Sequence, residues 1–306
     1  MRLIFMGTPA FAVASLQTLL NSEHDILGVV TVPDKPQGRG RKLQPSPVKK
    51  LALQHDLPVY QPVSLKDSDF LAEMSRLAPD LFTVVAFRIL PEVLFRMPTA
   101  GTINLHGSLL PRYRGAAPIQ WALLNGESET GVTTFFIQKS VDTGNMLLQR
   151  KLPIKPDETF GELHDRMAEL GATTLLDTID GIAAGTLQAT PQDDTLATRA
   201  PKITPDLLPI DFTQSASKVH NQIRAFSPKP GAYTVLVGQR IKFLRSHLVA
   251  KQGRPGKVIA VDRDGFTVAC GDQALTITEV QPEGKRAMES RAFLSGNPLQ
   301  TGDLFG

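Results

Sequence analysis

The chain has 306 residues, which exceeds what one compact core usually holds and suits two domains. Hydrophobic residues make up 42% of it and charged residues 21%, which excludes a disordered or fibrous protein. The single cysteine, Cys270, excludes a disulfide framework or a multi-cysteine metal centre and indicates a reducing compartment. No apolar stretch reaches the length of a membrane span, and the first residues lack a secretory-signal pattern. We therefore expect a cytoplasmic protein with no membrane partner.

The net charge of +3 is unevenly distributed along the chain. Residues 1–206 hold 20 basic and 22 acidic side chains, whereas residues 207–306 hold 13 basic and 8 acidic ones. Residues 33–50 depart from their acidic surroundings, because one acid, Asp34, stands among several basic side chains. These are Lys35, Arg39, Arg41, Lys42, Lys49 and Lys50. A basic segment together with a basic C-terminal region is expected where two surfaces bind one polyanion, although a solvated charged loop explains the segment equally well.

Hydrophobic periodicity predicts alternating strands and helices in the first part of the chain. We expect strands at residues 2–6, 25–32, 58–60 and 81–86 and from Gly101, with helices at residues 10–20, 46–55, 66–78, 117–124 and 160–181. Ser46 is the predicted N-cap of its helix. Two β-rich runs, residues 130–138 and 146–152, predict a hairpin around residues 140–144. This order predicts an α/β fold with a Rossmann-like, mostly parallel sheet and helices on both faces.

The remainder of the chain has a different pattern. Residues 185–206 contain three prolines and predict an irregular linker. A helix at residues 215–226 and five short β-runs follow, at residues 232–237, 241–248, 256–261, 267–269 and 275–280. Short strands with glycine-bearing turns predict a small OB-like β-barrel. We therefore expect a catalytic domain at residues 1–187, a linker at 188–206 and a C-terminal domain at 207–306.

The residues most suggestive of chemistry follow Gly101. Asn104 and His106 are two positions apart on a predicted strand, so both side chains point to one face, beside the crevice at the carboxyl end of a parallel sheet. An amide and an imidazole there are suitable donors to an oxygen that gains negative charge. Asp142, at the tip of the predicted hairpin, is a candidate partner of His106. A hydrogen-bonded structural histidine and ordinary Asp-Thr-Gly turn chemistry explain the same residues, and nothing local decides between the two explanations.

The run Asn104-Leu-His-Gly-Ser-Leu-Leu-Pro-Arg-Tyr-Arg-Gly-Ala-Ala-Pro-Ile-Gln120, with Asp142-Thr-Gly144, resembles the active-site signature of the 10-formyltetrahydrofolate-dependent formyltransferases. The resemblance implies that Asn104, His106 and Asp142 are catalytic. It also implies that four consecutive residues contact the folate, namely Ser108, Leu109, Leu110 and Pro111. The implied formyl donor is 10-formyltetrahydrofolate, used as a cosubstrate, and no metal is expected.

Three further segments resemble the members of that family whose acceptor is initiator methionyl-tRNA: Phe5–Pro9, Pro33–Val48 and Ile223–Ala232. The resemblance implies formylation of the α-amino group of tRNA-bound methionine, which gives N-formylmethionyl-tRNA for translation initiation. It implies that the basic segment and the C-terminal domain contact the tRNA. The residues expected to do so in the basic segment are Lys35, Arg39, Arg41 and Lys42. We expect the protein to act as a monomer.

One departure from the family pattern lies near the expected folate crevice. Phe87-Arg88 stands where Tyr-Gly is expected, with one residue fewer before Leu90-Pro91, and this could change contacts to the pterin. Three other functions compete with tRNA formylation. A sugar nucleotide or a purine precursor as acceptor needs neither the basic segment nor the C-terminal domain. A folate-dependent RNA-binding protein needs no intact catalytic residues, and a metal hydrolase needs a second ligand near His106 that the sequence lacks.

Overall fold

The computed structural model describes residues 1–37, 42–297 and 299–306. The chain forms two compact units that alternate along the sequence. The N-terminal unit comprises Met1–Gly115, Gly131–Leu152 and Asp165–Arg199. The C-terminal unit comprises Ala116–Thr130, Pro153–His164 and Ala200–Gly306. The predicted domain boundaries at residues 187 and 207 stay a prediction.

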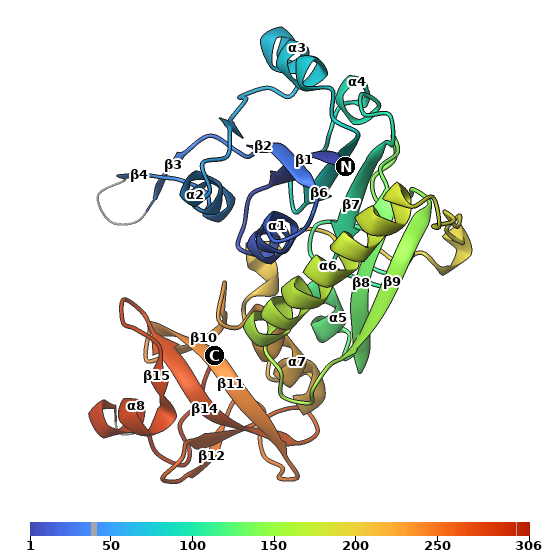
Figure 1. Cartoon of the computed structure of the whole chain (residues 1–306). Coiled ribbons are helices and arrows are strands. Elements are labelled where there is room, and N and C mark those ends of the chain that lie inside the picture. The colour runs from blue at the N-terminus through green and yellow to red at the C-terminus, as the bar shows by residue number, and fades with distance from the viewer. Residues whose placement is uncertain (38–41, 298) are drawn as a thin grey trace. The chain divides into compact units, whose positions relative to one another are not determined.

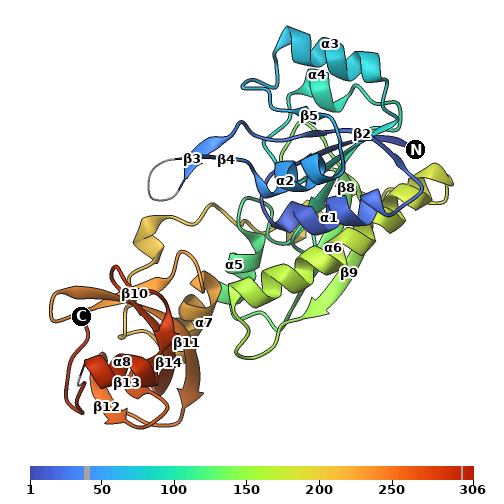
Figure 2. The same cartoon turned by 60° about the vertical axis from the view of Figure 1, so that its left-hand side comes forward.

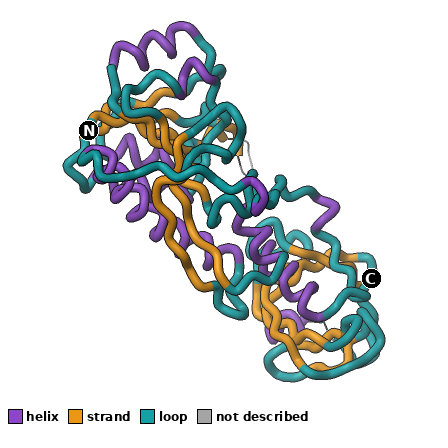
Figure 3. Tube along the Cα trace, turned by 90° about the vertical axis from the view of Figure 1, so that its right-hand side faces the viewer, coloured by secondary structure: helices purple, strands orange, loops and turns teal. Residues whose placement is uncertain are grey.

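A seven-stranded sheet forms the centre of the N-terminal unit, in the order β5-β2-β1-β6-β7-β8-β9 (Figure 1). Its strands are β1 (Arg2–Gly7), β2 (Asp25–Val30), β5 (Val59–Tyr60), β6 (Leu81–Val85), β7 (Thr102–His106), β8 (Glu129–Phe136) and β9 (Met146–Pro153). The strands from β5 to β7 run parallel, and β8 is antiparallel to β7. The strands β8 and β9 form the predicted hairpin and lie side by side in Figure 3. The mostly parallel α/β sheet is therefore confirmed.

Helices cover both faces of this sheet (Figure 2). On one face, Ile4 and Met6 of β1 pack against α3 (Ser68–Leu77) and α4 (Glu92–Phe95). On the other face lie α1 (Phe11–Leu20) and α6 (Phe160–Ala183), where Gly171 of α6 sits directly against Leu105. Because both faces are covered, β1 and β6 are almost wholly apolar, as buried parallel strands require.

The described residues of the basic segment, 33–37 and 42–50, form a strand pair that the sequence does not predict. The pair is a short antiparallel ribbon, β3 (Lys35–Gln37) paired with β4 (Lys42–Gln44). The helix α2 (Pro47–Gln54) follows, and the predicted cap is confirmed because the Ser46 hydroxyl accepts a hydrogen bond from the Lys49 amide at 3.0 Å. The sequence does not predict this ribbon, because its paired residues show no alternation of apolar and polar side chains.

The C-terminal unit contains the antiparallel barrel strands that the sequence predicts. The sheet runs in the order β10-β11-β14-β13-β12, with β15 paired to β14. Its strands are β10 (Ala232–Leu236), β11 (Gln239–Val249), β12 (Val258–Val261), β13 (Phe266–Ala269), β14 (Ala274–Pro282) and β15 (Met288–Glu289). The helices of this unit are α5 (Pro118–Leu124), α7 (Ala216–Phe226) and α8 (Ser290–Gly296), and α7 packs on α5 and β11. Two short 3₁₀ turns, η1 (Asp194–Leu196) and η2 (Pro205–Leu207), lie in the segment predicted to be a linker.

The end of the chain joins the two edge strands of the C-terminal sheet. The Val258 amide of β12 donates to the Asp303 carbonyl at 2.8 Å, and the Gly306 amide donates to the Val235 carbonyl of β10 at 3.2 Å. Between these contacts the ring of Phe305 enters an aromatic cluster, with its centroid 5.3 Å from that of Phe243. The C-terminal residues thus satisfy backbone groups that the open edges would otherwise expose.

The only cysteine is buried in this unit, which predicts an unreactive thiol. Cys270 is 2% exposed, and burial, reinforced by the nearby Asp272 charge, raises the pKa of its thiol to about 12. We expect native protein at pH 8 to react very slowly with a disulfide reagent, because the thiolate is the attacking form. Unfolding in guanidinium should release one fast-reacting thiol per chain. Rapid reaction of native protein would contradict the burial.

Within the described part of the chain, we find no helix with both the length and the apolar character that crossing a membrane requires.

Candidate active site

Asn104 and His106 occupy the carboxyl end of β7, as predicted. In the sheet register Asn104 is the neighbour of Val84, and Val84 is the neighbour of Met6. These residues face α3 and α4, so the apolar core under that face ends in two polar side chains at the edge of the sheet. A crevice at this edge is where open parallel sheets bind ligands. The sequence predicted this placement because alternation along a strand fixes the face of each side chain.

The His106 ring is buried and held in one orientation. Its Nε2 lies 2.9 Å from the Tyr113 carbonyl oxygen, which only accepts hydrogen bonds. Nε2 therefore carries the hydrogen and donates it, and in the neutral ring Nδ1 keeps its lone pair. Nδ1 lies 3.9 Å from Oδ2 of Asp142. The Tyr113 contact could not be predicted from the sequence, because any residue type supplies a backbone carbonyl.

The hairpin between β8 and β9 brings Asp142 to His106. The Asp142 backbone has φ 56°, in the left-handed region, and its Oδ2 accepts a hydrogen bond from the Gly115 amide at 2.9 Å. Its side chain is 12% exposed. The pattern of residues left open whether Asp142 reaches His106. The structure brings the two together, at a separation that a small shift converts to a direct hydrogen bond.

Gly144 explains why the turn that carries Asp142 ends in glycine. A Cβ at this position would lie 1.6 Å from the Phe136 carbonyl oxygen at the end of β8. No side chain fits at that separation, so the two arms of the hairpin meet at a point that only glycine permits. The glycine of the Asp-Thr-Gly sequence is therefore required by the packing of the hairpin.

The Asn104 amide is available to a ligand. Its side chain is half-buried, and among the described residues it has no hydrogen-bond partner. A half-buried amide without a partner is costly unless water or a ligand satisfies it. The Asn104 amide suits a carbonyl oxygen of a substrate, and His106 adds a second donor only when Nδ1 carries a proton, because Nε2 donates to the Tyr113 carbonyl.

The four residues predicted to contact folate form a braced loop next to His106. The Ser108 hydroxyl donates to the Arg112 carbonyl at 2.6 Å. The Leu110 amide donates to Thr133 Oγ1 at 3.1 Å, and the Leu110 carbonyl accepts from the Gln149 amide at 2.7 Å. The side chains of Ser108 and Leu110 are buried, whereas those of Leu109 and Pro111 are half-buried. Their contact with folate stays a prediction.

The residues predicted to bind tRNA are only partly within the described chain. Lys35 is exposed at the start of β3. Lys42 begins β4, with only its backbone described, and Arg39 and Arg41 lie outside the described residues. Asp34, the one acid of the segment, is engaged: Lys49 Nζ donates to it at 2.8 Å, which lowers the pKa of the Asp34 carboxyl. The acid is thus offset by a neighbouring cation.

Arg88, the departure from the family pattern, connects two loops at the same edge of the sheet. Its Nη1 donates to the Val63 carbonyl at 3.0 Å and its Nη2 to the Pro62 carbonyl at 2.9 Å. Burial without an acidic partner lowers the pKa of the Arg88 guanidinium. The loop after β6 is thereby tied to the loop after β5. Its effect on folate binding stays a prediction.

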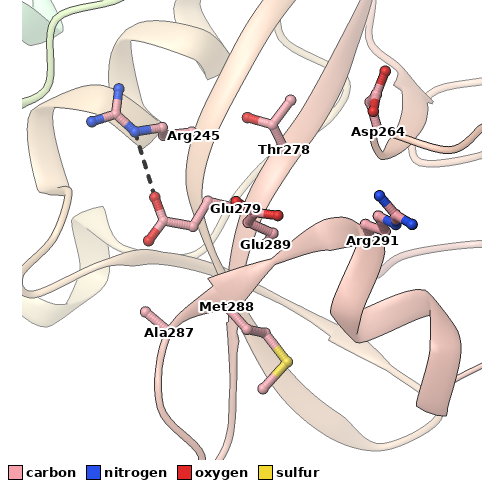
Figure 4. Close-up of a pocket in the computed structure, with 8 residues that line it drawn as sticks. All are labelled: Arg245, Asp264, Thr278, Glu279, Ala287, Met288, Glu289 and Arg291. Carbon is pink, nitrogen blue, oxygen red and sulfur yellow. Dashed lines mark ion pairs between the residues drawn. The ribbon is translucent and has the colours of Figure 1, made fainter.

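A hollow of about 740 Å³ in the C-terminal unit is a second candidate site (Figure 4). It is lined by Arg245, Asp264, Thr278, Glu279, Ala287, Met288, Glu289 and Arg291. Arg245 is ion-paired with Glu279 at 3.5 Å and also with Glu162, so its charge is already offset. None of the sequence-predicted residues lines this hollow. Among the described residues, no group of three or more His, Cys, Asp and Glu is placed to hold a metal ion.

Comparison with known proteins identifies the class. A family model described as formyl transferase matches residues 1–179, and a model of the formyl transferase C-terminal domain matches residues 202–298. The chain therefore belongs to the formyl transferase family. A relative from Moorella thermoacetica, a methionyl-tRNA formyltransferase, is 49% identical over 100% of this chain and 99% of its own. Because the identity is this high and extends over both full lengths, the chain belongs with the methionyl-tRNA formyltransferases within this family.

Solved structures confirm the fold. HypX from Aquifex aeolicus, in a complex with tetrahydrofolic acid, matches with a TM-score of 0.68 and 18% identity over 100% of this chain and 50% of that chain. The sugar 3N-formyl transferase WlaRD, in the presence of dTDP and 5-N-formyl-THF, matches with a TM-score of 0.69 and 21% identity over 94% and 99% of the two chains. Since enzymes with different acceptors share this fold, the fold alone does not select the acceptor.

Proposed function

We propose that this protein transfers the formyl group of 10-formyltetrahydrofolate to the α-amino group of methionine on initiator methionyl-tRNA, giving N-formylmethionyl-tRNA. The observation that carries the proposal is the meeting of Asn104, His106 and Asp142 at the carboxyl end of β7 in a chain of this family. The reaction belongs in the cytoplasm, where charged tRNA and reduced folate are both present, and a single chain contains every residue assigned to it. We therefore propose a cytoplasmic monomer.

The chemistry requires stabilisation of a tetrahedral oxyanion. The acceptor amine attacks the formyl carbon, and the carbonyl oxygen gains negative charge as the C=O π bond opens. When the tetrahedral intermediate collapses, the C=O bond re-forms and the bond to N10 of the folate breaks. The Asn104 amide, which has no other partner among the described residues, donates to this oxygen. His106 contributes through Nδ1 once that nitrogen is protonated, since Nε2 is held by the Tyr113 carbonyl.

Asp142 takes part in the proton transfers of the reaction. The amine must lose a proton as it forms the new C–N bond, and the Asp142 carboxylate and the Nδ1 lone pair of His106 are the two groups placed to accept it. The 3.9 Å between Asp142 Oδ2 and His106 Nδ1 allows either a direct contact or a substrate group to lie near both. The amine proton passes to this pair, and N10 of the folate receives a proton when it leaves.

The folate is placed beside the braced loop at Ser108–Pro111. Backbone groups and the half-buried side chains of Leu109 and Pro111 are the contacts this loop offers, because the Ser108 hydroxyl is committed to Arg112. The exposed Lys35 and the neighbouring basic side chains of the segment bind phosphates of the acceptor stem.

A transfer assay tests the proposal. The protein is supplied with 10-formyltetrahydrofolate carrying a labelled formyl group and with one acceptor at a time: initiator methionyl-tRNA, elongator methionyl-tRNA, or a dTDP-amino sugar. We expect label on the initiator methionyl-tRNA, with much less on the other two. Transfer to the sugar, or to no acceptor, would overturn the proposal. Light scattering on a sizing column should give the mass of one chain.

The basic segment should contribute to tRNA affinity through charge. Replacing Arg39, Arg41 and Lys42 together with alanine is expected to weaken binding and to reduce the slope of log Kd against log salt by about 2, since each phosphate contact contributes roughly 0.7–0.9. The matched control also replaces three basic residues with alanine, on or beside the helices α3 and α4: Lys66, Arg76 and Arg96. An unchanged slope in the first variant would show that the segment does not bind phosphates.

A further inference from the structure

A segment predicted to be a linker lies along the active site of the N-terminal unit. At one end, Thr190 and Met146 exchange backbone hydrogen bonds of 2.8 Å in both directions, at the start of β9. At the other end, the Arg114 amide donates to the Thr198 carbonyl at 2.9 Å, and the Tyr113 amide donates to Thr198 Oγ1 at 2.8 Å. Residues 190–199, here called the strap, are thus anchored to the hairpin of Asp142 and to the loop whose Tyr113 carbonyl holds His106.

Gln192 is the side chain of the strap that joins the two anchored parts. Its Nε2 donates to the carbonyls of Asp142 at 2.9 Å and Gly144 at 2.8 Å. Its Oε1 accepts from Arg114 Nε at 3.0 Å and from Arg114 Nη2 at 2.7 Å. Arginine only donates and carbonyls only accept, so the amide has one possible orientation. Every polar atom of this side chain is used.

The contact acts on a strained part of the site. Asp142 has a left-handed backbone, which is unfavourable for a residue with a side chain. Gln192 binds the carbonyl of that same residue, and Arg114 is held further by Asp194 at 2.7 Å. The carboxylate accepts a hydrogen bond from the Gly115 amide, which follows Arg114 directly. The position of Asp142 relative to His106 therefore depends on the Arg114–Gln192 bridge.

We propose that Gln192 is a positioning residue for formyl transfer: it holds Asp142 within reach of His106 by coupling the β8–β9 hairpin to the loop at residues 111–115. The inference rests on the function proposed above. Gln192 need not touch either substrate. Its effect should therefore fall on the chemical step rather than on substrate affinity.

Two substitutions at the position separate this role from simple packing. Gln192→Ala should lower the single-turnover rate about a hundredfold, the loss expected when a reacting group is displaced by ~1 Å, with the KM of both substrates little changed. Gln192→Glu keeps the size and the acceptor for Arg114 but replaces both donors, so it should be at least as slow. The matched control is Gln188→Ala, an exposed glutamine of the preceding residues. A wild-type rate in Gln192→Glu would overturn the proposal.

A double-mutant cycle tests whether Gln192 acts through Asp142. In an Asp142→Ala background, Gln192→Ala should have no further effect on the rate, because the group it positions is gone. Full additivity of the two losses would show that Gln192 acts elsewhere and would overturn the inference. Circular dichroism and thermal melting of each variant check that the fold is retained. Failure of the wild-type protein to formylate methionyl-tRNA would instead refute the proposed function, so the two failures are distinguishable.

Discussion

Asn104→Ala and His106→Ala are each expected to lower the rate of formyl transfer by about a hundred- to a thousandfold, the usual loss for one oxyanion donor. The affinity for tRNA should stay nearly intact, because both side chains, on β7, are proposed to bind the reacting oxygen rather than the phosphates. Single-turnover rates and filter binding measure the two quantities separately. His106→Ala also removes the hydrogen bond from Nε2 to the Tyr113 carbonyl, so thermal melting of this variant should accompany the rate measurement.

The matched control for the histidine variant is His55→Ala, which removes an exposed imidazole after α2. Its rate and tRNA affinity should equal those of the wild-type protein. Normal turnover in either Asn104→Ala or His106→Ala would refute the assignment of the oxyanion donors. A parallel loss of tRNA affinity would show that the residue contributes to binding instead of to the chemical step.

Gly144→Ala is expected to lower the rate of formyl transfer about a hundredfold or more, although it adds one methyl group and no charge. The added Cβ would lie 1.6 Å from the Phe136 carbonyl oxygen, which is far inside contact distance. The hairpin must open to admit it, and this moves Asp142 away from His106. A displacement of that size costs about a hundredfold or more in rate, and overpacking of this kind typically costs about 1–3 kcal/mol of stability. The transfer assay and urea unfolding measure the two effects.

Gly296→Ala is the matched control, because nothing lies within 4 Å of an added Cβ at that position. It should leave both rate and stability unchanged. Soluble, folded Gly144→Ala protein with a normal rate would show that the close approach of the hairpin is not needed for catalysis. Loss of folding would be revealed by circular dichroism, and Asp142→Ala then measures the contribution of the carboxylate in a hairpin that is intact.

Much of the fold could be predicted because its cause is local. Alternation and helical periodicity place β1, β6 and β7, and the Ser46 cap follows from the preference of a short hydroxyl for free amides at a helix start. The ribbon of β3 and β4 and the short helix α4 were missed. Their residues carry no sustained hydrophobic pattern. The ribbon forms through the pairing of Lys35–Gln37 with Lys42–Gln44, which no pattern within either segment predicts.

The site was predicted in part for the same reason. Two residues that are two positions apart on one strand have their side chains on the same face, so Asn104 and His106 could be placed together from sequence. Prolines and polar residues predict a linker at residues 188–206, and they say nothing about the long-range hydrogen bonds that the strap makes. Gln192 reaches Asp142 across 50 positions of sequence, a separation that no local pattern encodes.

The sequence by itself determined the family, the order of the longer strands and helices, and the polar pair at the end of β7. Those features depend on residue type and on spacing within a single element. Only the tertiary structure decided that Asp142 lies 3.9 Å from His106, that the Tyr113 carbonyl fixes the imidazole, and that Gln192 joins the two loops. These contacts connect separate segments of the chain, so they exist only once the sheet, the hairpin and the strap have packed together.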